Sequence, residues 1–276
     1  MEIIKAVNVC FQYNNNYPVL DHVNISIIQG KKTAILGRNG SGKSTLMKLI
    51  SGLLPITSGN IYVNGADINS IEGTNYIRKH CGIVFQNPDN QFVSPIVEED
   101  IKFGLKSHRI TKDEFPLRIK TSLEKVNLSG YEKKRIYNLS GGQKQKTAIA
   151  GILAMHNDIL IFDESTSMLD PYSRNEILEC MHSLQNENKT IIVITQNIND
   201  VADADFIYLL ANKKIIASGT PEEILSDTNK LEHAKIQIPF PVRIYQDLRK
   251  NGIHLSSCPL TLEKLSEDIC SLKYKI

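Results

Sequence analysis

The chain has 276 residues, of which 41% are hydrophobic and 22% charged, as expected for a globular protein with a sizeable core. A net charge of +2 argues against DNA or RNA as the main partner. No apolar run approaches the ~18–20 residues of a membrane span, and the N-terminus lacks the pattern of a signal peptide. The five cysteines are scattered without CxxC spacing, which is typical of reduced thiols. We therefore expect a cytosolic protein that reaches a membrane only through a partner.

The first part of the chain predicts a strand-rich lobe. Alternating apolar and polar residues at 2–12 and 20–28 predict two antiparallel strands, and residues 32–36 predict a short buried strand. A glycine-rich turn follows, and then a helix at about 43–51. A further strand precedes a predicted turn at Asn64-Gly65.

The middle of the chain predicts a helical insertion and then an alternation of helices and strands. The charged, strand-poor stretch 95–137 favours helices. The elements expected after it are a helix at about 143–155, a buried strand at 158–163, a helix at about 171–187 and a buried strand at 190–195. Helices that alternate with buried strands predict a parallel sheet covered on both faces.

The pattern changes near Lys235, where Pro239 and Pro241 interrupt the chain. Two short amphipathic helices are predicted beyond them, at about 242–251 and 261–272. The predicted domains are residues 1–234, with a helical subdomain at about 90–155, and a small C-terminal domain at 235–276.

The glycine-rich turn fits the pattern G-x-x-x-x-G-K-[ST] and lies between a buried strand and a helix, as a phosphate-binding loop requires. Its glycines let backbone N–H groups point at a phosphate, and the helix N-terminus adds a positive dipole end. Lys43 supplies a charge for the β- and γ-phosphates, and the Ser44 hydroxyl can bind Mg²⁺. The predicted nucleotide-binding residues here are Gly37, Arg38, Asn39, Gly40, Ser41, Gly42, Lys43, Ser44 and Thr45.

Two adjacent acids, Asp163 and Glu164, end the buried strand at 158–163. The carboxyl end of such a strand lies where open α/β sheets bind ligands, beside the phosphate loop. Because neighbouring residues of a strand point to opposite sides, we expect different roles for the two acids. Asp163 is the predicted Mg²⁺ ligand, and Glu164 is the predicted general base that polarises the attacking water.

A second turn into a helix, Leu139 to Gln143, shares two features with the phosphate loop, exposed backbone N–H groups and a helix N-terminus, and both favour an anion. One chain needs only one phosphate site, so a second cradle suits the ATP of another molecule. This pentapeptide, LSGGQ, is identical to the signature motif of ATP-binding-cassette (ABC) proteins, and the order and spacing of the three motifs match that family. The resemblance covers about residues 2–230. It implies that Ser140, Gly141, Gly142 and Gln143 cover the ATP bound by a partner chain.

The resemblance implies a fold and further site residues. The fold is α/β, a P-loop NTPase core of the ABC type with a β-rich N-terminal lobe, an inserted α-helical subdomain and a small C-terminal extension. Tyr13 resembles the aromatic residue that stacks on adenine. Gln86 resembles the glutamine that reaches Mg²⁺ and couples to the membrane subunit, and Asp170 resembles the aspartate that links the two sites of the dimer.

Gln196 stands where the family usually has a catalytic histidine. An imidazole can carry a positive charge near neutral pH, which an amide cannot. An amide can still donate a hydrogen bond to a phosphate oxygen, so a weakened site and a fully competent one both remain compatible with this residue.

A narrower resemblance concerns the ATPases of energy-coupling factor transporters, which import vitamins and transition-metal ions. Residues 85–92 and 165–171 are similar to theirs, although Ser165 replaces the usual Ala or Pro. The resemblance implies a cassette that hydrolyses ATP with Mg²⁺ at the cytoplasmic face of the cell membrane. The implied partners are a second ABC ATPase subunit, in a heterodimer, a transmembrane scaffold subunit and a substrate-binding membrane subunit.

Three other functions share some of these motifs. ABC ATPases of DNA repair carry a long coiled coil between the phosphate loop and the signature, and this interval is too short for one. Translation-factor types carry two cassettes in one chain, and this chain has one. The alternative left open is a non-hydrolysing or weakly active regulatory half of a heterodimeric ATPase pair, which Gln196 favours and Glu164 opposes.

Overall fold

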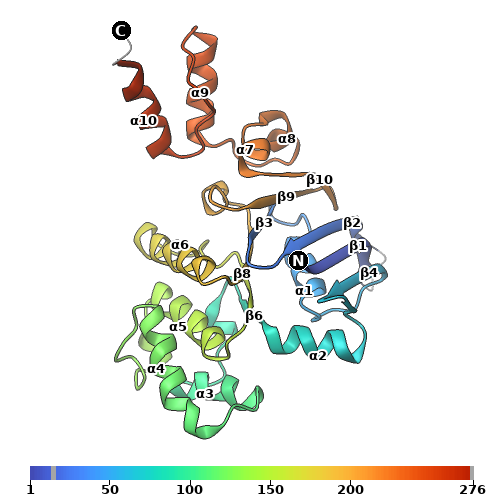
Figure 1. Ribbon diagram of the computed structural model, residues 1–276, viewed down its shortest axis with the longest axis vertical. Helices are drawn as coiled ribbons and strands as arrows, with labels where there is room; N and C mark the ends of the chain where they lie inside the picture. The colour runs from blue at the N-terminus through green and yellow to red at the C-terminus, as the bar shows by residue number, and fades with distance from the viewer. Residues whose placement is uncertain (14–16, 274–276) are drawn as a thin grey trace.

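The computed structural model describes residues 1–13 and 17–273 and has the expected α/β architecture, with two sheets (Figure 1). The first sheet is antiparallel, in the order β2-β1-β4-β5. Its strands are β1 (Glu2–Gln12), β2 (Pro18–Ile28), β4 (Ser58–Val63) and β5 (Ala66–Asp67). The predicted turn at Asn64-Gly65 joins β4 to β5, and both of its residues have positive φ, 48° and 82°.

The second sheet has the order β10-β9-β3-β8-β7-β6 and is parallel except for the antiparallel edge strand β10. Its strands are β3 (Lys32–Leu36), β6 (Cys81–Val84), β7 (Ile159–Asp163), β8 (Thr190–Thr195), β9 (Phe206–Ala211) and β10 (Lys214–Gly219). The carboxyl ends of β3, β7 and β8 therefore meet at one edge, as the sequence predicts for the motifs that follow them.

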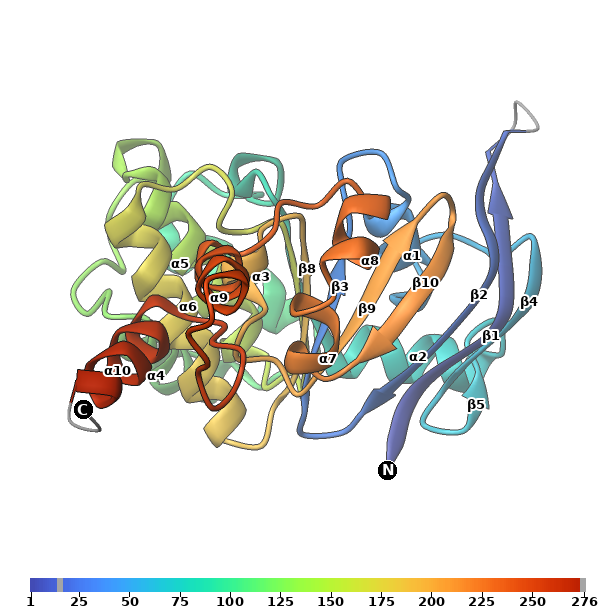
Figure 2. The same ribbon diagram turned by 90° about the horizontal axis from the view of Figure 1, so that it is seen from above.

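The helices separate into groups in Figures 1 and 2. Helices α3 and α4 lie at one end of the long axis and α9 and α10 at the other (Figure 1). Their bounds are α1 (Lys43–Ile50), α2 (Ile71–His80), α3 (Val97–Ser107), α4 (Phe115–Lys125), α5 (Gly141–Ala154), α6 (Pro171–Asn186), α7 (Pro221–Leu225), α8 (Thr228–His233), α9 (Phe240–Lys250) and α10 (Leu262–Lys273).

Strand β7 shows how the sheet separates two cores. Ile159 and Ile161 belong to a hydrophobic cluster shared with the N-terminal sheet and α1, whereas Leu160 and Phe162 belong to a cluster shared with α3 to α6. Successive side chains of a strand alternate between faces, so an unbroken apolar strand fills both cores. A third cluster joins β3 and β9 to α7 and α8 and includes Ile236.

The structure also contains elements that the sequence did not predict. Helix α2, strands β6, β9 and β10, and helices α7 and α8 were not assigned. Strand β6 has only four residues, one of them Gly82, which is too short for a clear pattern. Helix α5 begins at Gly141 rather than near residue 143, because Ser140 caps it and both glycines lie in its first turn.

The C-terminal helices α9 and α10 follow the end of α8 at His233, close to the change of pattern predicted at Lys235. Ile236 and Val242 are buried, so this segment is not detached from the rest of the described chain. The division into domains at residues 1–234 and 235–276 stays a prediction. Among the described residues, no helix combines the length and the apolar character that crossing a membrane requires.

Candidate nucleotide site

The phosphate loop connects β3 to α1, and its lysine is buried against the loop backbone. Gly40 and Gly42 have φ values of 78° and 105°, a left-handed backbone that residues with a side chain adopt only at a cost. Lys43 begins α1, is 4% exposed, and donates from Nζ to the Arg38 carbonyl oxygen over 3.1 Å. The ammonium group is therefore held inside the loop, where the N-terminus of α1 also points.

The sheet edge holds the first residue of this loop. The Gly37 N–H donates to the Thr195 carbonyl over 3.2 Å, and Arg38, Asn39 and Gly40 are exposed at the tip. Among the residues that the structure describes, the Ser41 hydroxyl is buried without a hydrogen-bond partner. A buried donor without an acceptor is costly, so the loop fits an added anionic group such as a phosphate.

The two acids at the end of β7 contact different residues. Asp163 Oδ1 accepts a hydrogen bond from Ser44 Oγ over 3.1 Å, whereas Glu164 Oε1 forms an ion pair with Lys43 Nζ at 3.1 Å. The separation that the sequence predicted is present, but strand alternation is only part of its cause. Strand β7 ends at Asp163, and Glu164 has a left-handed backbone with φ 47°, held by its N–H to the Ile194 carbonyl.

Asp163 lies in a setting that suits a cation. Burial raises the pKa of its carboxyl group, and the hydrogen bond from Ser44 opposes that rise only in part. A carboxylate and a hydroxyl on adjacent elements are oxygen ligands of the kind that Mg²⁺ prefers. A bound cation would offset the cost of ionising this buried acid, so the residues present fit Mg²⁺.

Gln86 reaches the same group of side chains from the loop after β6. Its Nε2 donates to Ser167 Oγ over 3.2 Å and lies 3.5 Å from Glu164 Oε2. Two glutamines that sequence reasoning missed hold this loop, because Gln145 Nε2 donates to the Phe85 carbonyl over 3.1 Å and Gln91 binds Ile83 and Phe85. No local sequence motif predicts these two contacts.

Tyr13 lies at the end of β1, near the helix that begins at the phosphate loop. Its hydroxyl group is 3.2 Å from Thr45 Oγ1, and its ring contacts Phe11 edge to face with centroids 4.8 Å apart. The residue is 47% exposed, which leaves ring surface open to a planar ligand. The predicted stacking on adenine stays a prediction.

The signature turn forms a capping box. Ser140 Oγ accepts from the Gln143 N–H, and Gln143 Oε1 accepts from the Ser140 N–H over 3.0 Å. Both views place α5 in the helical part of the molecule and α1 against the N-terminal sheet (Figures 1 and 2). The two helices that begin at the predicted anion cradles thus lie in different parts of the fold, as expected if the signature covers a partner's ATP.

Close packing explains one glycine of this turn. A Cβ on Gly142 would lie 2.6 Å from Ser173 Oγ of helix α6. The signature helix α5 and helix α6, which begins after Asp170, therefore approach each other where only a glycine fits.

Asp170 and Gln196 directly precede α6 and directly follow β8, respectively. Asp170 is the N-cap of α6 and accepts from the Ser173 N–H over 3.0 Å, and this backbone hydrogen bond lowers the pKa of its carboxyl group. Gln196 is exposed directly after β8. Gln196, Ser167 and Arg38 line a cleft of about 910 Å³ that is also lined by C-terminal residues such as Arg243.

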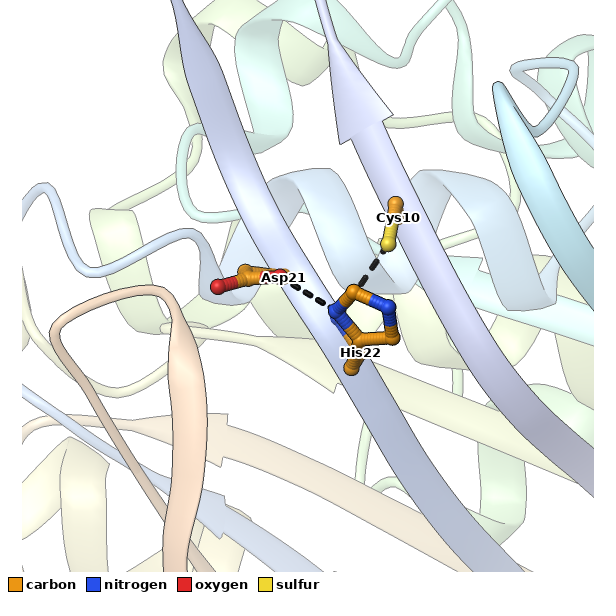
Figure 3. A group of neighbouring side chains, drawn as sticks. All are labelled: Cys10, Asp21 and His22. Carbon is orange, nitrogen blue, oxygen red and sulfur yellow. Dashed lines mark hydrogen bonds and ion pairs between the residues drawn. The ribbon is translucent and has the colours of Figure 1, made fainter.

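A separate cluster, Cys10, Asp21 and His22, lies on β1 and β2 (Figure 3). The register shift between β1 and β2 places Asp21 and His22 opposite Cys10. Asp21 binds His22 Nδ1 at 2.5 Å and Lys214 Nζ at 3.0 Å. The ammonium group of Lys214 already neutralises the carboxylate, which opposes a cation there.

The comparisons with known proteins agree with this geometry. The ABC transporter family matches residues 20–167. The energy-coupling factor transporter ATP-binding protein EcfA1 of Latilactobacillus sakei subsp. sakei is 39% identical over 277 residues, covering 100% of this chain and 99% of the relative. The chain belongs to the ABC transporter family. The EcfA1 protein of Mycoplasmopsis pulmonis is 43% identical over 270 residues, covering 97% of this ABC protein and 100% of the relative.

Solved structures support the same assignment. The cbiO1 protein of Clostridium perfringens, part of the ABC transporter complex cbiONQ, has a TM-score of 0.76 and 33% identity, covering 89% of this ABC protein and 99% of that chain. The cassette MJ0796 in a post-hydrolysis state with ADP and Pi has a TM-score of 0.70 and 27% identity, covering 79% and 98%. The fold expected from the sequence is therefore confirmed, and the chain is an ABC-type ATPase that binds nucleotide.

Proposed function

We propose that this ABC protein hydrolyses ATP with Mg²⁺ to drive an energy-coupling factor transporter that imports vitamins or transition-metal ions. The observation that carries the proposal is the arrangement of Lys43, Ser44, Asp163 and Glu164 at one sheet edge, in a chain similar to EcfA1 proteins over its whole length. Residues for charge neutralisation and for base catalysis lie together there, as phosphoryl transfer requires.

Each residue has a defined part in the proposed mechanism. The loop backbone and Lys43 bind the phosphates, and Ser44, Asp163 and Gln86 would hold Mg²⁺, which neutralises developing charge when bound. Glu164 accepts the proton of the attacking water, and Gln196 donates a hydrogen bond to a γ-phosphate oxygen. Tyr13 stacks on adenine, residues 140–143 cover the partner's ATP, and Asp170 links the two sites.

The proposed assembly contains a second ABC ATPase, a transmembrane scaffold and a substrate-binding membrane subunit, with this chain at the cytoplasmic face of the cell membrane. The regulatory alternative is not favoured, because Glu164 is present beside Lys43 and the full-length relatives are named as transporter ATP-binding proteins. The absence of the usual histidine at Gln196 bears on the rate of the site rather than on its existence.

The test is isolation of the complex from host membranes after tagging this chain, followed by uptake measurements in vesicles. Uptake of a labelled vitamin or Co²⁺ or Ni²⁺ should require ATP and should stop in Glu164→Gln, while the complex stays intact. Recovery of the chain without any membrane protein would contradict the proposed assembly.

A further inference from the structure

Asp200 is a buried carboxylate that no motif of the sequence singled out. It is 1% exposed and ends a short 3₁₀ turn (Ile198–Asp200) after β8. Its Oδ2 accepts hydrogen bonds from Thr166 Oγ1 and Thr195 Oγ1, both over 2.9 Å. Its Oδ1 accepts from Arg174, over 2.7 Å from Nη2 and 3.1 Å from Nε.

Each of these donors lies within four residues of a residue of the proposed site in the sequence. Thr166 is two residues after Glu164, and Thr195 directly precedes Gln196. Arg174 lies in the first turn of α6, where its N–H donates to the carbonyl of Asp170 over 2.9 Å. One carboxylate thus joins the segments that carry the base, the γ-phosphate contact and the residue that links the two sites.

The direction of the Thr195 hydroxyl is fixed as well. Thr195 Oγ1 accepts from the Asn197 N–H over 2.9 Å, so its single proton is left for Asp200. This pair of bonds bends the chain directly around Gln196. A change at Asp200 therefore alters the loop on which Gln196 stands.

Burial of these groups disfavours other arrangements of the three segments. Thr166 and Thr195 are 6% and 3% exposed, so a hydroxyl left without its acceptor here loses its hydrogen bond without gaining water. The charge of Asp200 is balanced by Arg174, and a buried charge without its partner is more costly still. Alternative arrangements of the three segments are thus disfavoured as long as the carboxylate is present.

We propose that Asp200 is a positioning residue for ATP hydrolysis, which orients Glu164 and Gln196 through Thr166 and Thr195 without contacting nucleotide. The proposal rests on the proposed roles of those two residues. It predicts a split between binding and turnover. Lys43 and the phosphate loop carry the binding and are not bonded to Asp200, whereas a base displaced by about 1 Å can lose on the order of 100-fold in rate.

The experiment uses the full chain in the complex isolated with it from membranes, and compares matched variants. Thr166→Val removes one donor to Asp200 with almost no change of shape, and Thr166→Ser keeps the hydroxyl. Thr190→Val is the control, because Thr190 is a buried threonine at the opposite end of β8 whose Oγ1 accepts from the Gly30 N–H over 3.0 Å. Glu164→Gln defines the rate without the base.

Single-turnover hydrolysis, the Kd for ATP with Mg²⁺ and the Tm are measured for each variant. We expect Thr166→Val to lower the rate roughly 10-fold while the Kd stays within about twofold of wild type. Thr166→Ser should restore the rate, and Thr190→Val should lower the Tm and leave the rate unchanged. Asp200→Asn, which keeps the shape but removes the charge, should lower the rate at least as much as Thr166→Val.

Two outcomes would overturn the proposal. A wild-type rate in Thr166→Val would show that the hydroxyl bond to Asp200 positions nothing. An equal loss of rate in Thr190→Val would show that any buried threonine of this region supports turnover through stability alone. A wild-type rate no higher than that of Glu164→Gln would instead contradict the proposed function, so the two failures are distinguishable.

Discussion

Lys43 Nζ lies 3.1 Å from Glu164 Oε1, and the two side chains are 4% and 8% exposed. The proposed phosphate ligand and the proposed base therefore form a buried ion pair in which each balances the other's charge. An incoming phosphate takes over the ammonium group, which leaves the carboxylate to bind water. In the proposed mechanism, the base is therefore released from this ion pair when the substrate binds.

Replacing the base separates ATP binding from hydrolysis. Glu164→Gln keeps the shape but removes the carboxylate, so hydrolysis should fall by at least ~100-fold. Lys43 loses its competing partner, so ATP should bind as well as in wild type or more tightly, and the dimer should accumulate with ATP. Asp158→Asn is a matched control, since Asp158 precedes β7 at its other end and pairs with Lys189. Rapid turnover by Glu164→Gln would remove this residue from its assigned role.

The lysine itself is tested by its removal. Lys43→Ala deletes the charge that faces the β- and γ-phosphates, so the affinity for ATP should fall sharply. The fold should survive, because the loop backbone stays intact. Equilibrium titration with a fluorescent ATP analogue measures the Kd, and Lys48→Ala, in the last turn of the same helix α1, serves as the control. An unchanged Kd in Lys43→Ala would place the nucleotide elsewhere.

The proposed action of the signature on a partner's ATP is tested at Ser140. Ser140→Arg puts bulk and charge into the cradle, so ATP-driven dimer closure should fail while this chain still binds nucleotide. Ser140→Ala is the control, because it loses only the N-cap of α5, at a cost of about 1 kcal/mol. It distinguishes the loss of the cap from obstruction of the cradle by the arginine side chain. Size-exclusion chromatography with ATP in the Glu164→Gln background reports closure. Normal closure by Ser140→Arg would contradict the sandwich arrangement.

Gln196 is predicted to make this chain's site the slower one of a pair. Opposite a transferring phosphoryl group, a charge-assisted hydrogen bond is about twice as strong as a neutral one. A difference of about 1–2 kcal/mol corresponds to roughly 5- to 30-fold in rate. Gln196→His should therefore speed single-turnover hydrolysis at this site several-fold. An unchanged rate would mean that the amide suffices and that the histidine of other members is not limiting here.

Ionisation of the Asp163 carboxyl group should make the stability of the fold depend on pH. Burial raises the pKa of its carboxyl group, and an acid of this kind stabilises the fold while protonated and loses that contribution as the pH rises through its folded pKa. At neutral pH the ionised carboxylate therefore destabilises the nucleotide-free protein. Asp163→Asn should raise the Tm by a few degrees near neutral pH and by less as the pH falls towards the ordinary pKa of an aspartate, since ~1 kcal/mol corresponds to about 2–4 °C in a chain of this size.

The same variant should lose the Mg²⁺ dependence of ATP binding, because a neutral amide is a poor substitute for a carboxylate ligand. Thermal melts with and without Mg²⁺ and ATP report both effects. A Tm that falls at neutral pH would show that the ionised acid is stabilised by its surroundings and not penalised by burial.

Sequence motifs located the candidate site because its residues are contiguous within short segments. Residues 37–44 and 139–143 each carry their own turn chemistry, and Asp163 ends a strand that is apolar throughout. The alternation of strands with helices was sufficient to predict the parallel sheet and its covered faces.

Interactions between distant segments could not be predicted in this way. Asp200 meets Thr166 and Arg174 only because the turn after β8, the loop after β7 and the first turn of α6 converge, and nothing in the sequence around Asp200 distinguishes it from a solvated turn residue. The left-handed backbone of Glu164 is imposed by its bond to Ile194 on the neighbouring strand. The sequence also did not predict the hairpin of β9 and β10. Strand β9 pairs with β3, a segment far from it in the sequence.

The position of β7 between two cores bears on local opening. Its backbone amides are bonded within a ladder flanked by β6 and β8, and its side chains alternate between the two hydrophobic clusters. Hydrogen exchange at these amides therefore requires both cores to open together, which places them among the last to take up deuterium. The strand that ends in Asp163 is thus among the segments with the slowest exchange, and Glu164 directly follows it.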